Sequence, residues 1–129
     1  MEYQRDEHRV HVVIYHWVWT PKRRKAVLKD AIASGCEQLI RGKCQDKGWN
    51  ILELAIQPDH IHLFVRVWPT DCAAAVVKEC KGITSYHLRA HHPVLKKLPS
   101  LWTRRYFAAT AGNVSQATMA RYIAAQKEL

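Results

Sequence analysis

The sequence lacks the features that mark a secreted or membrane-spanning protein. Its first ten residues, MEYQRDEHRV, contain no apolar stretch of the kind that a signal peptide requires. No apolar run elsewhere reaches the roughly 20 residues that a membrane-spanning helix needs. The four cysteines form no C-x-x-C pair, which argues against a zinc ribbon or a disulfide framework. We therefore expect a cytoplasmic protein, with no membrane association and with reduced, mostly buried thiols.

Acidic residues are few compared with basic ones. There are 20 lysines and arginines against 11 aspartates and glutamates, which gives a formal net charge of +9. An excess of positive charge favours a polyanionic partner, and nucleic acid is the leading candidate. Charge of this kind indicates a class of partner but no particular activity.

The length and composition predict one folded unit. The chain has 129 residues, of which 48% are hydrophobic and 24% are charged, so it is able to bury a core. No internal repeat, low-complexity segment or shift in composition divides it. We predict a single domain over residues 1–129.

The N-terminal half predicts a strand, a basic turn and a helix. β-branched and aromatic residues from His8 to Thr20 are typical of a strand, which ends at Pro21 because proline cannot extend a ladder. The turn Lys22 to Lys25 follows directly. Apolar residues near helical spacing then predict a helix from Ala26 to about Lys47, just before Gly48.

The rest of the chain predicts a hairpin, a helix, a strand and a final helix. Strand-like runs on either side of Pro58 and Asp59 indicate an antiparallel hairpin. Thr70 or Asp71 is a candidate cap for the helix that follows. The expected elements are strands at Ile51–Gln57, His60–Trp68 and Arg104–Thr110, helices ending near His91 and spanning Val114–Glu128, and a loop at Leu95–Leu101.

This order gives an α+β fold. A βαββαβ order followed by one more helix fits a ferredoxin-like or RRM-like sandwich, in which two helices pack on one face of an antiparallel sheet. The extra C-terminal helix carries a tyrosine. Many unrelated functions share this architecture, so function has to be argued from individual residues.

Two histidines near the start of the second hairpin strand are the strongest local signal. Because side chains alternate along a strand, His60 and His62 share one face and the apolar residues Ile61 and Leu63 share the other. The two histidines are one strand repeat apart, about 7 Å, close enough for both imidazoles to reach one cation. An isolated H-x-H is more often two polar residues on a wet face, and Asp59 is expected to form a turn hydrogen bond.

The last helix supplies a second set of candidates. Tyr122 and Gln126 are four residues apart and share one face of that helix. Tyrosine is a poor nucleophile near neutral pH because its pKa is about 10, and a divalent cation helps by stabilising charge on a phosphate. The Gln126 amide oxygen is a candidate third ligand. The simpler interpretation of Tyr122 is a packed helix residue, and Tyr106, beside Arg104 and Arg105, is a competing nucleophile.

Three stretches together resemble the single-tyrosine transposases of the HUH nuclease superfamily, the insertion-sequence-200-like enzymes of elements that move as single-stranded DNA. YHWVWTPKRRKAVL (15–28) is similar to the first strand and basic turn of that family, and QPDHIHLFV (57–65) to its histidine motif. VSQATMARYIAAQ (114–126) is similar to its tyrosine helix. The match covers nearly the whole chain in the same order.

The resemblance implies a mechanism and partners. His60, His62 and Gln126 would hold Mg²⁺ or Mn²⁺, and Tyr122 would attack a DNA phosphate to form a 5′-phosphotyrosine link. Members of the family are homodimers that recognise hairpins in single-stranded DNA, and the tyrosine helix can be donated to the partner subunit. Gly112 would then be a hinge, since glycine tolerates the change of dihedral angles that a moving helix requires.

Basic clusters and tryptophans are candidates for holding DNA. Phosphate contacts are expected from Lys22, Arg23, Arg24, Lys25, Lys96, Lys97, Arg104 and Arg105, although each cluster is equally consistent with a solvated patch. Trp17, Trp19, Trp68 and Trp102 are candidates for base stacking and equally for the core or a dimer interface, and the latter is favoured for Trp17. The other histidines, His16 among them, are interpreted as surface or packing residues.

Two other functions fit the sequence less well. A non-catalytic module that binds single-stranded nucleic acid would carry an aromatic RNP-like octapeptide, and none is evident. An HUH replication initiator or relaxase usually needs a longer chain.

Overall fold

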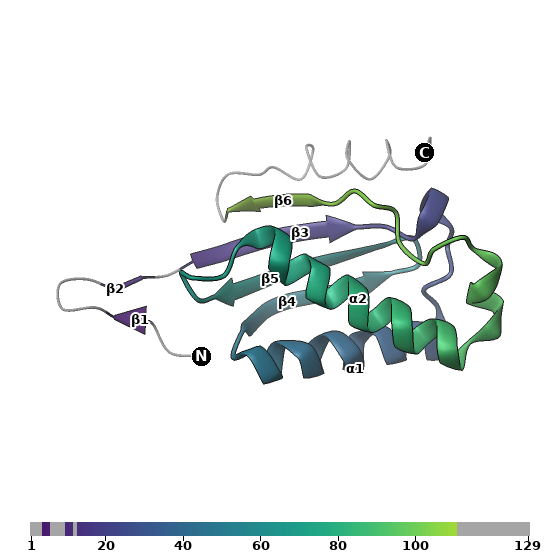
Figure 1. Ribbon diagram of the computed structural model, residues 1–129, viewed down its shortest axis with the longest axis horizontal. Helices are drawn as coiled ribbons and strands as arrows, with labels where there is room; N and C mark the ends of the chain where they lie inside the picture. Colours follow the sequence, from purple (N-terminus) through teal and green to yellow (C-terminus); the bar gives the residue numbers. More distant parts are fainter. Residues whose placement is uncertain (1–3, 6–9, 12, 111–129) are drawn as a thin grey trace.

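A computed structural model describes residues 4–5, 10–11 and 13–110 of the chain (Figure 1). Side chains are described from residue 13 onward. The expected hinge Gly112, the candidate nucleophile Tyr122, the candidate metal ligand Gln126 and the last predicted helix lie outside this part.

The described chain forms a four-stranded antiparallel sheet with two helices, which confirms the predicted α+β architecture. The strand order in the sheet is β4-β5-β3-β6. The elements are β3 (Val13–Trp19), α1 (Asp30–Lys47), β4 (Asn50–Gln57), β5 (His60–Val67), α2 (Ala73–His91) and β6 (Phe107–Thr110). Before them, β1 (Gln4–Arg5) and β2 (Val10–His11) form a separate two-stranded ribbon, so the first predicted strand is divided.

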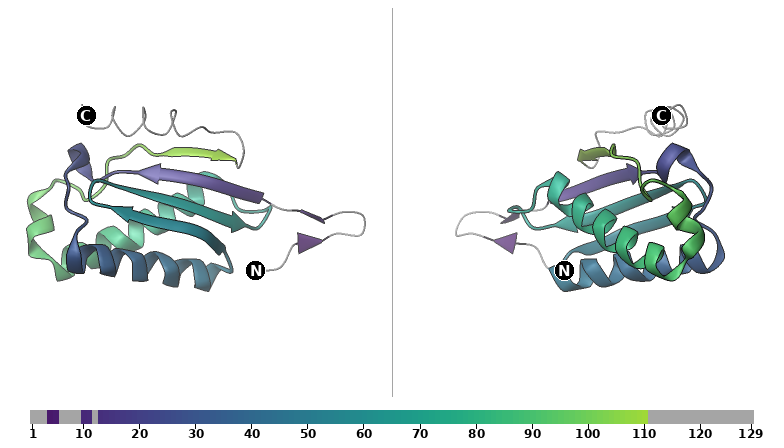
Figure 2. Two further views of the ribbon diagram at one scale, coloured as in Figure 1. Left: turned by 180° about the vertical axis from the view of Figure 1, so that it is seen from behind. Right: turned by 45° about the vertical axis from the view of Figure 1, so that its right-hand side comes forward.

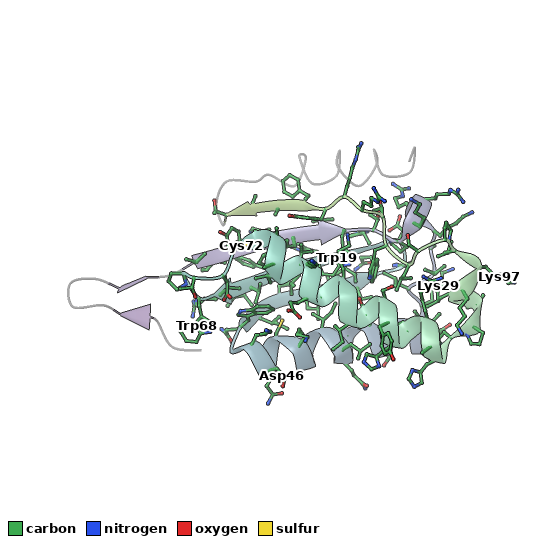
Figure 3. All side chains as sticks on the ribbon, viewed as in Figure 1. Trp19, Lys29, Asp46, Trp68, Cys72 and Lys97 are labelled. Atoms are coloured by element: carbon green, nitrogen blue, oxygen red, sulfur yellow. The ribbon has the colours of Figure 1, made fainter. Side chains whose placement is uncertain are left out.

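Both helices lie on the same face of the sheet. Figure 1 shows α2 in front of the strands and α1 along the edge formed by β4, and the view from behind in Figure 2 shows α2 beyond the sheet. The core between these layers includes Trp17, Ile61, Leu63, Ile40 and Val77, all at most 1% exposed. Trp19, labelled in Figure 3, is fully buried and packs edge-on against Trp102, whose indole N–H bonds to α2.

Strand β5 has the predicted alternation. Ile61, Leu63, Val65 and Val67 are buried toward the helices, and the residues between them are half-buried on the other face. Removing these four side chains from water stabilises the sheet–helix packing, at about 1.5–3 kcal/mol for each aliphatic side chain fully buried. This pattern fixes the register, because a slip of one residue would turn the histidines into the core.

Helix α1 begins four residues later than predicted. Lys22–Arg24 form a short 3-10 turn, η1, in which Arg23 and Arg24 have positive φ angles of 56° and 51°. Residues 25–29 then lie outside any helix, and the Leu28 backbone N–H donates to the Pro58 carbonyl at 3.0 Å. Because that hydrogen bond ties the segment to the β4–β5 hairpin, the apolar Leu28 is buried outside a helix.

Helix α2 begins without the predicted side-chain cap. Its N-cap residue is Cys72, and no side chain caps the helix. The Asp71 carboxylate instead accepts hydrogen bonds from the Trp49 indole N–H at 2.7 Å and from the Trp68 backbone N–H at 3.1 Å. Asp71 therefore closes the turn between β5 and α2 and links it to the start of β4.

The segment from α2 to β6 contains more structure than the predicted loop. Pro93–Lys97 form a 3-10 turn, η2, whose Leu95 is fully buried. Strand β6 begins at Phe107, three residues after the predicted start. No helix in the described residues is long and apolar enough to span a membrane.

Candidate metal and nucleic-acid site

The two histidines of the H-x-H motif lie on the sheet face opposite the helices, as predicted. The register places His60 beside Gln57 of β4, and His62 between Ala55 of β4 and Val18 of β3. The side chains of His60 and His62 are 24% and 17% exposed. Both imidazoles are therefore held by neighbours and still reach solvent.

A carboxylate fixes His60. The Asp59 Oδ1 atom lies 2.9 Å from His60 Nδ1, and the other Asp59 oxygen lies 3.1 Å from Arg24 Nε. An ionised carboxylate only accepts hydrogen bonds, so Nδ1 of His60 carries the proton and Nε2 carries the lone pair. The expectation of a turn hydrogen bond for Asp59 is thus replaced by a link from the basic turn, through Asp59, to His60.

A second carboxylate lies at ion-pair distance from His62, on a side chain that is 60% exposed. Glu53 Oε1 from β4 lies 3.2 Å from His62 Nδ1. The other ring nitrogen of His62, Nε2, lies 3.1 Å from Nδ1 of His16 on β3. Pairing a histidine Nδ1–H with a carboxylate is how proteins commonly orient imidazoles that bind metals through Nε2.

His16, which the sequence pattern assigned to the surface or to packing, is part of this site. The His16 ring stacks on Phe64, with ring centroids 4.2 Å apart and planes 7° apart. Burial and then the neighbouring His62 lower the pKa of His16, against a smaller opposite effect of Glu53. The strand register, which places His16 beside Phe64, could not be predicted from the sequence. Alternation along one strand shows which residues share a face, but it does not show which residues of the next strand lie beside them.

These donors fit a divalent cation. Two imidazoles protonated on Nδ1 would offer Nε2 lone pairs to a cation, and because Mg²⁺ and Mn²⁺ favour oxygen ligands, either ion would also need oxygen donors. Within residues 13–110, no three His, Cys, Asp or Glu side chains are grouped so as to hold a metal ion. A complete ligand set therefore needs a donor of another type or from another segment.

Two of the predicted basic clusters lie next to one another and next to the histidine motif. The backbone N–H of Lys22 donates to the Leu101 carbonyl at 2.8 Å, and that of Thr103 donates to the Thr20 carbonyl at 3.1 Å. The turn Lys22–Lys25 and the exposed pair Arg104 and Arg105 thus flank one end of the sheet. Lys96 and Lys97 are exposed on η2, and Figure 3 shows Lys97 toward the same end as Lys29.

The tryptophans are not placed to stack on bases at this site. Trp17, Trp19 and Trp102 are at most 5% exposed and belong to the core. Trp68 follows the far end of β5, where its indole N–H donates to the Lys47 carbonyl at 3.2 Å. The stacking interpretation is wrong for Trp19 and Trp102, because both fill the space between the sheet and α2.

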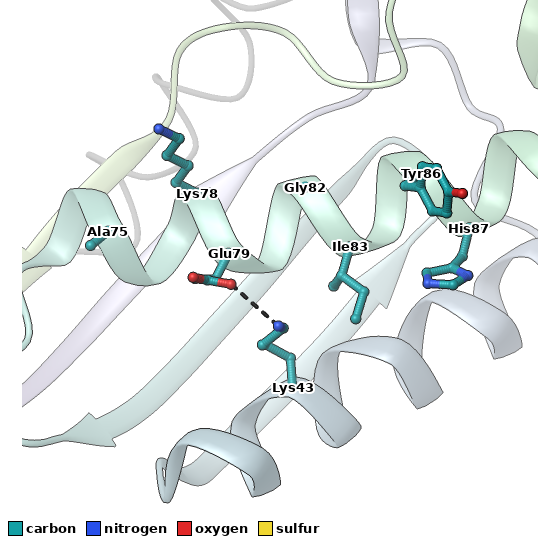
Figure 4. Close-up of a pocket in the computed structure, with 8 residues that line it drawn as sticks. All are labelled: Lys43, Ala75, Lys78, Glu79, Gly82, Ile83, Tyr86 and His87. Atoms are coloured by element: carbon teal, nitrogen blue, oxygen red, sulfur yellow. Dashed lines mark ion pairs between the residues drawn. The ribbon is translucent and has the colours of Figure 1, made fainter.

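The described tyrosines lie on the helix side of the sheet, away from the histidines. Tyr15 is opposite the buried Val65, and Tyr106 lies under the Lys81 ammonium group of α2, which is 5.9 Å from the ring centroid. Tyr86 is 74% exposed on α2, beside a groove of about 520 Å³ that Figure 4 shows between the two helices. None of these three hydroxyls faces the His60–His62 pair, which argues against Tyr106 as the competing nucleophile.

The family comparison decides what kind of protein this is. The family model described as "Transposase IS200 like" matches residues 9–126. The chain belongs to this family.

Individual relatives are similar along most of the chain. The ISDra2 transposase TnpA of Deinococcus radiodurans is 26% identical over 131 residues, which cover 99% of this chain and 94% of its own length. The transposase for insertion sequence element IS200 of Salmonella typhimurium is 28% identical over 117 residues, or 88% of this chain and 76% of its own.

Solved structures agree with this assignment. A crystal structure of a Deinococcus radiodurans protein described as a transposase superposes with a TM-score of 0.86 at 28% identity, covering 95% of this chain and 97% of the other. A REP-associated tyrosine transposase bound to a REP hairpin superposes with a TM-score of 0.60 at 14% identity, covering 92% and 68%. The second likeness shows a shared fold.

Proposed function

We propose that this IS200-like transposase cleaves and rejoins single-stranded DNA through a covalent tyrosine link, with Tyr122 as nucleophile. The observation that carries the proposal is the pairing of His60 and His62 with their own carboxylates on the sheet face opposite the helices. His60, His62 and Gln126 would hold Mg²⁺ or Mn²⁺. Bound there, the cation would stabilise negative charge that develops on the scissile phosphate.

The chain's own groups carry the covalent steps. The Tyr122 oxygen attacks phosphorus, the bond from phosphorus to the 3′ oxygen breaks, and the tyrosine proton is lost to solvent while the leaving oxygen gains one. The new 5′-phosphotyrosine keeps the energy of the broken ester bond. A 3′ hydroxyl of another strand then reverses the step and releases the tyrosine, so no nucleotide cofactor is consumed.

The basic residues at this end of the sheet would hold the DNA. Lys22, Arg23, Lys25 and Arg105 would contact phosphates near this end of the sheet, and contacts of this kind weaken as salt rises. Arg104 lines a pocket with Lys81 and Tyr106 beside α2, so a phosphate that it contacts would lie on the helix side of the sheet. The solved relative that is bound to a REP hairpin supports hairpin DNA as the class of ligand. We propose a homodimer in which Gly112 is the hinge for the tyrosine helix.

The test is a covalent adduct on a denaturing gel. Full-length protein is incubated with Mn²⁺ and single-stranded oligonucleotides that carry the imperfect palindromes flanking its gene. We expect a protein–DNA adduct that disappears in Tyr122→Phe and in excess chelator, and that persists in Tyr106→Phe. An adduct that survives in Tyr122→Phe but not in Tyr106→Phe would show that the nucleophile is misassigned.

Two further measurements separate the alternatives. His60→Ala should abolish the adduct while leaving the affinity for the oligonucleotide nearly unchanged, whereas a module that only grips DNA would bind and never form an adduct. Light scattering of the purified protein should give twice the chain mass of 14.9 kDa. A monomer at assay concentrations would contradict the proposed homodimer.

A further inference from the structure

The His62 ring is held at both nitrogens by residues from the two neighbouring strands. Glu53 of β4 approaches Nδ1 at 3.2 Å, and His16 of β3 approaches Nε2 at 3.1 Å. In the register, Glu53 and His16 both stand opposite Phe64. Both contacts therefore come from the side of His62 that is farther along β5 from His60.

The contact between the two histidines is an edge-to-edge hydrogen bond. Their ring planes differ by 2°, and their centroids are 5.3 Å apart while the two nitrogens are 3.1 Å apart. Two parallel imidazole rings can have nitrogens this close and centroids this far apart only when both rings lie nearly in one plane with those nitrogens facing each other. One nitrogen must then be protonated and the other must offer its lone pair.

The Glu53 carboxylate lies at ion-pair distance from Nδ1 and favours the His62 tautomer that is protonated there and presents a lone pair at Nε2. In that tautomer, Nδ1 of His16 is the donor to the lone pair. Stacking of the His16 ring on Phe64, with centroids 4.2 Å apart, keeps this N–H in the plane of His62.

We propose that His16 and Glu53 are positioning residues for the cation site. Glu53 fixes the His62 tautomer that a cation requires, and His16 Nδ1–H holds the Nε2 lone pair until a cation takes its place. This inference rests on the proposed metal-dependent function. It predicts opposite effects of the two residues on cation affinity, which a purely structural role for either would not produce.

The expected changes follow from what each residue does. A cation must displace the His16 hydrogen bond, so His16→Phe, which keeps an aromatic ring on Phe64, should tighten Mn²⁺ binding about two- to ten-fold. Glu53→Gln should weaken Mn²⁺ binding about ten-fold or more, as loss of a carboxylate behind a metal-binding histidine does. His87→Phe and Glu37→Gln, both on the helices, are the matched controls and should leave the affinity unchanged.

The test measures Mn²⁺ binding to the full-length protein by the electron paramagnetic resonance signal of free Mn²⁺, with no DNA present. Tighter binding by His16→Phe together with weaker binding by Glu53→Gln supports the inference. If the wild-type protein binds Mn²⁺ and both variants bind it equally well, the inference is overturned and the proposed function stands. If the wild-type protein binds no Mn²⁺, both are overturned.

A second measurement needs no variant. Long-range ¹H–¹⁵N correlation spectra of the metal-free protein, at a pH well above the ordinary imidazole pKa of about 6.5, report which nitrogen of each ring is protonated. We expect His62 as the Nδ1–H tautomer and His16 also protonated on Nδ1. A His62 ring protonated on Nε2 would overturn the inference even if the variants failed to fold.

Discussion

Arg24 Nε lies 3.1 Å from Asp59 Oδ2, and the same carboxylate contacts Nδ1 of His60 at 2.9 Å. The basic turn is thus joined to the histidine motif by an ion pair with side chains 22% and 29% exposed. Arg24 was predicted only as a DNA contact. Its position gives it a role in orienting His60 through Asp59.

This relationship predicts that Arg24→Gln lowers the rate of adduct formation more than it lowers DNA affinity. We expect about a ten-fold slower reaction, as for other groups that act behind a metal-binding histidine. The free energy of unfolding should fall by no more than about 1 kcal/mol, because the pair is partly exposed. Single-turnover cleavage and fluorescence anisotropy measure the two effects.

Arg41→Gln is the control for Arg24→Gln, since Arg41 pairs with Glu37 on the surface of α1. Arg41→Gln should change neither the rate of adduct formation nor the DNA affinity. If Arg24→Gln weakens binding as much as it slows cleavage, and flattens the salt dependence of binding, Arg24 acts as a phosphate contact and not through Asp59.

Substituting alanine should have opposite effects on stability at two glycines of α1, Gly48 at its C-terminal cap and Gly42 inside it. Gly48 ends the helix with a φ of 73°, and an added Cβ would lie 3.2 Å from the Trp68 indole nitrogen. Gly48→Ala should therefore destabilise the fold by about 1–2 kcal/mol. Gly42 lies inside α1 with nothing within 4 Å of an added Cβ, so Gly42→Ala should stabilise it by about 0.5–1 kcal/mol. Urea unfolding followed by circular dichroism tests both signs, and equal effects would contradict this description of the helix end.

Much of the fold could be predicted because it depends on patterns within single elements. The alternation of β5 placed His60 and His62 on one face, and Gly48 marked the end of α1. The start of α1 could not be predicted, because residues 25–29 are held by a hydrogen bond from Leu28 to Pro58, which is distant in sequence. Asp71 was misassigned as a cap for a similar reason, since its partner Trp49 is 22 residues away.

The candidate site also combines residues that the sequence pattern indicates with residues that only the tertiary structure brings together. The H-x-H motif was visible in the sequence, whereas His16, Glu53 and Arg24 reach it only through strand pairing and the path of the basic turn. Nothing in the spacing of these residues indicates such contacts. Tyr122 and Gln126 remain predictions.

Trp102 should contribute more to stability than Trp68 does. Its indole N–H donates to Thr84 Oγ1 at 2.9 Å and to the Lys81 carbonyl at 3.2 Å, and its side chain is buried against Trp19. Trp102→Phe should cost about 2–3 kcal/mol, from lost packing and an unpaired hydroxyl acceptor. Trp68→Phe, at a half-buried position, should cost about 1 kcal/mol. Urea denaturation of both variants measures the difference, and equal losses would show that the Thr84 hydrogen bond adds little.

The cysteines should differ sharply in reactivity. Cys72 is exposed, whereas Cys36, Cys44 and Cys80 are buried, and burial raises the pKa of Cys36 to about 12. Since the thiolate is the reactive form, we expect one thiol per chain to react with a chromogenic disulfide reagent at neutral pH. All four should react in denaturant. A Cys72→Ser variant that still reacts rapidly in the folded state would contradict the buried positions of the other three.

The most direct measurement of the central claim is mass spectrometry of the covalent adduct after nuclease and trypsin digestion. Each of the five tyrosines falls in a different tryptic peptide, because Arg5, Arg9, Lys81, Arg105 and Arg121 separate them. We predict a nucleotide joined through its 5′ phosphate to the tyrosine of YIAAQK, the peptide that begins at Tyr122. A nucleotide on the peptide that begins at Tyr106, or on any tyrosine other than Tyr122, would contradict the assignment of the nucleophile.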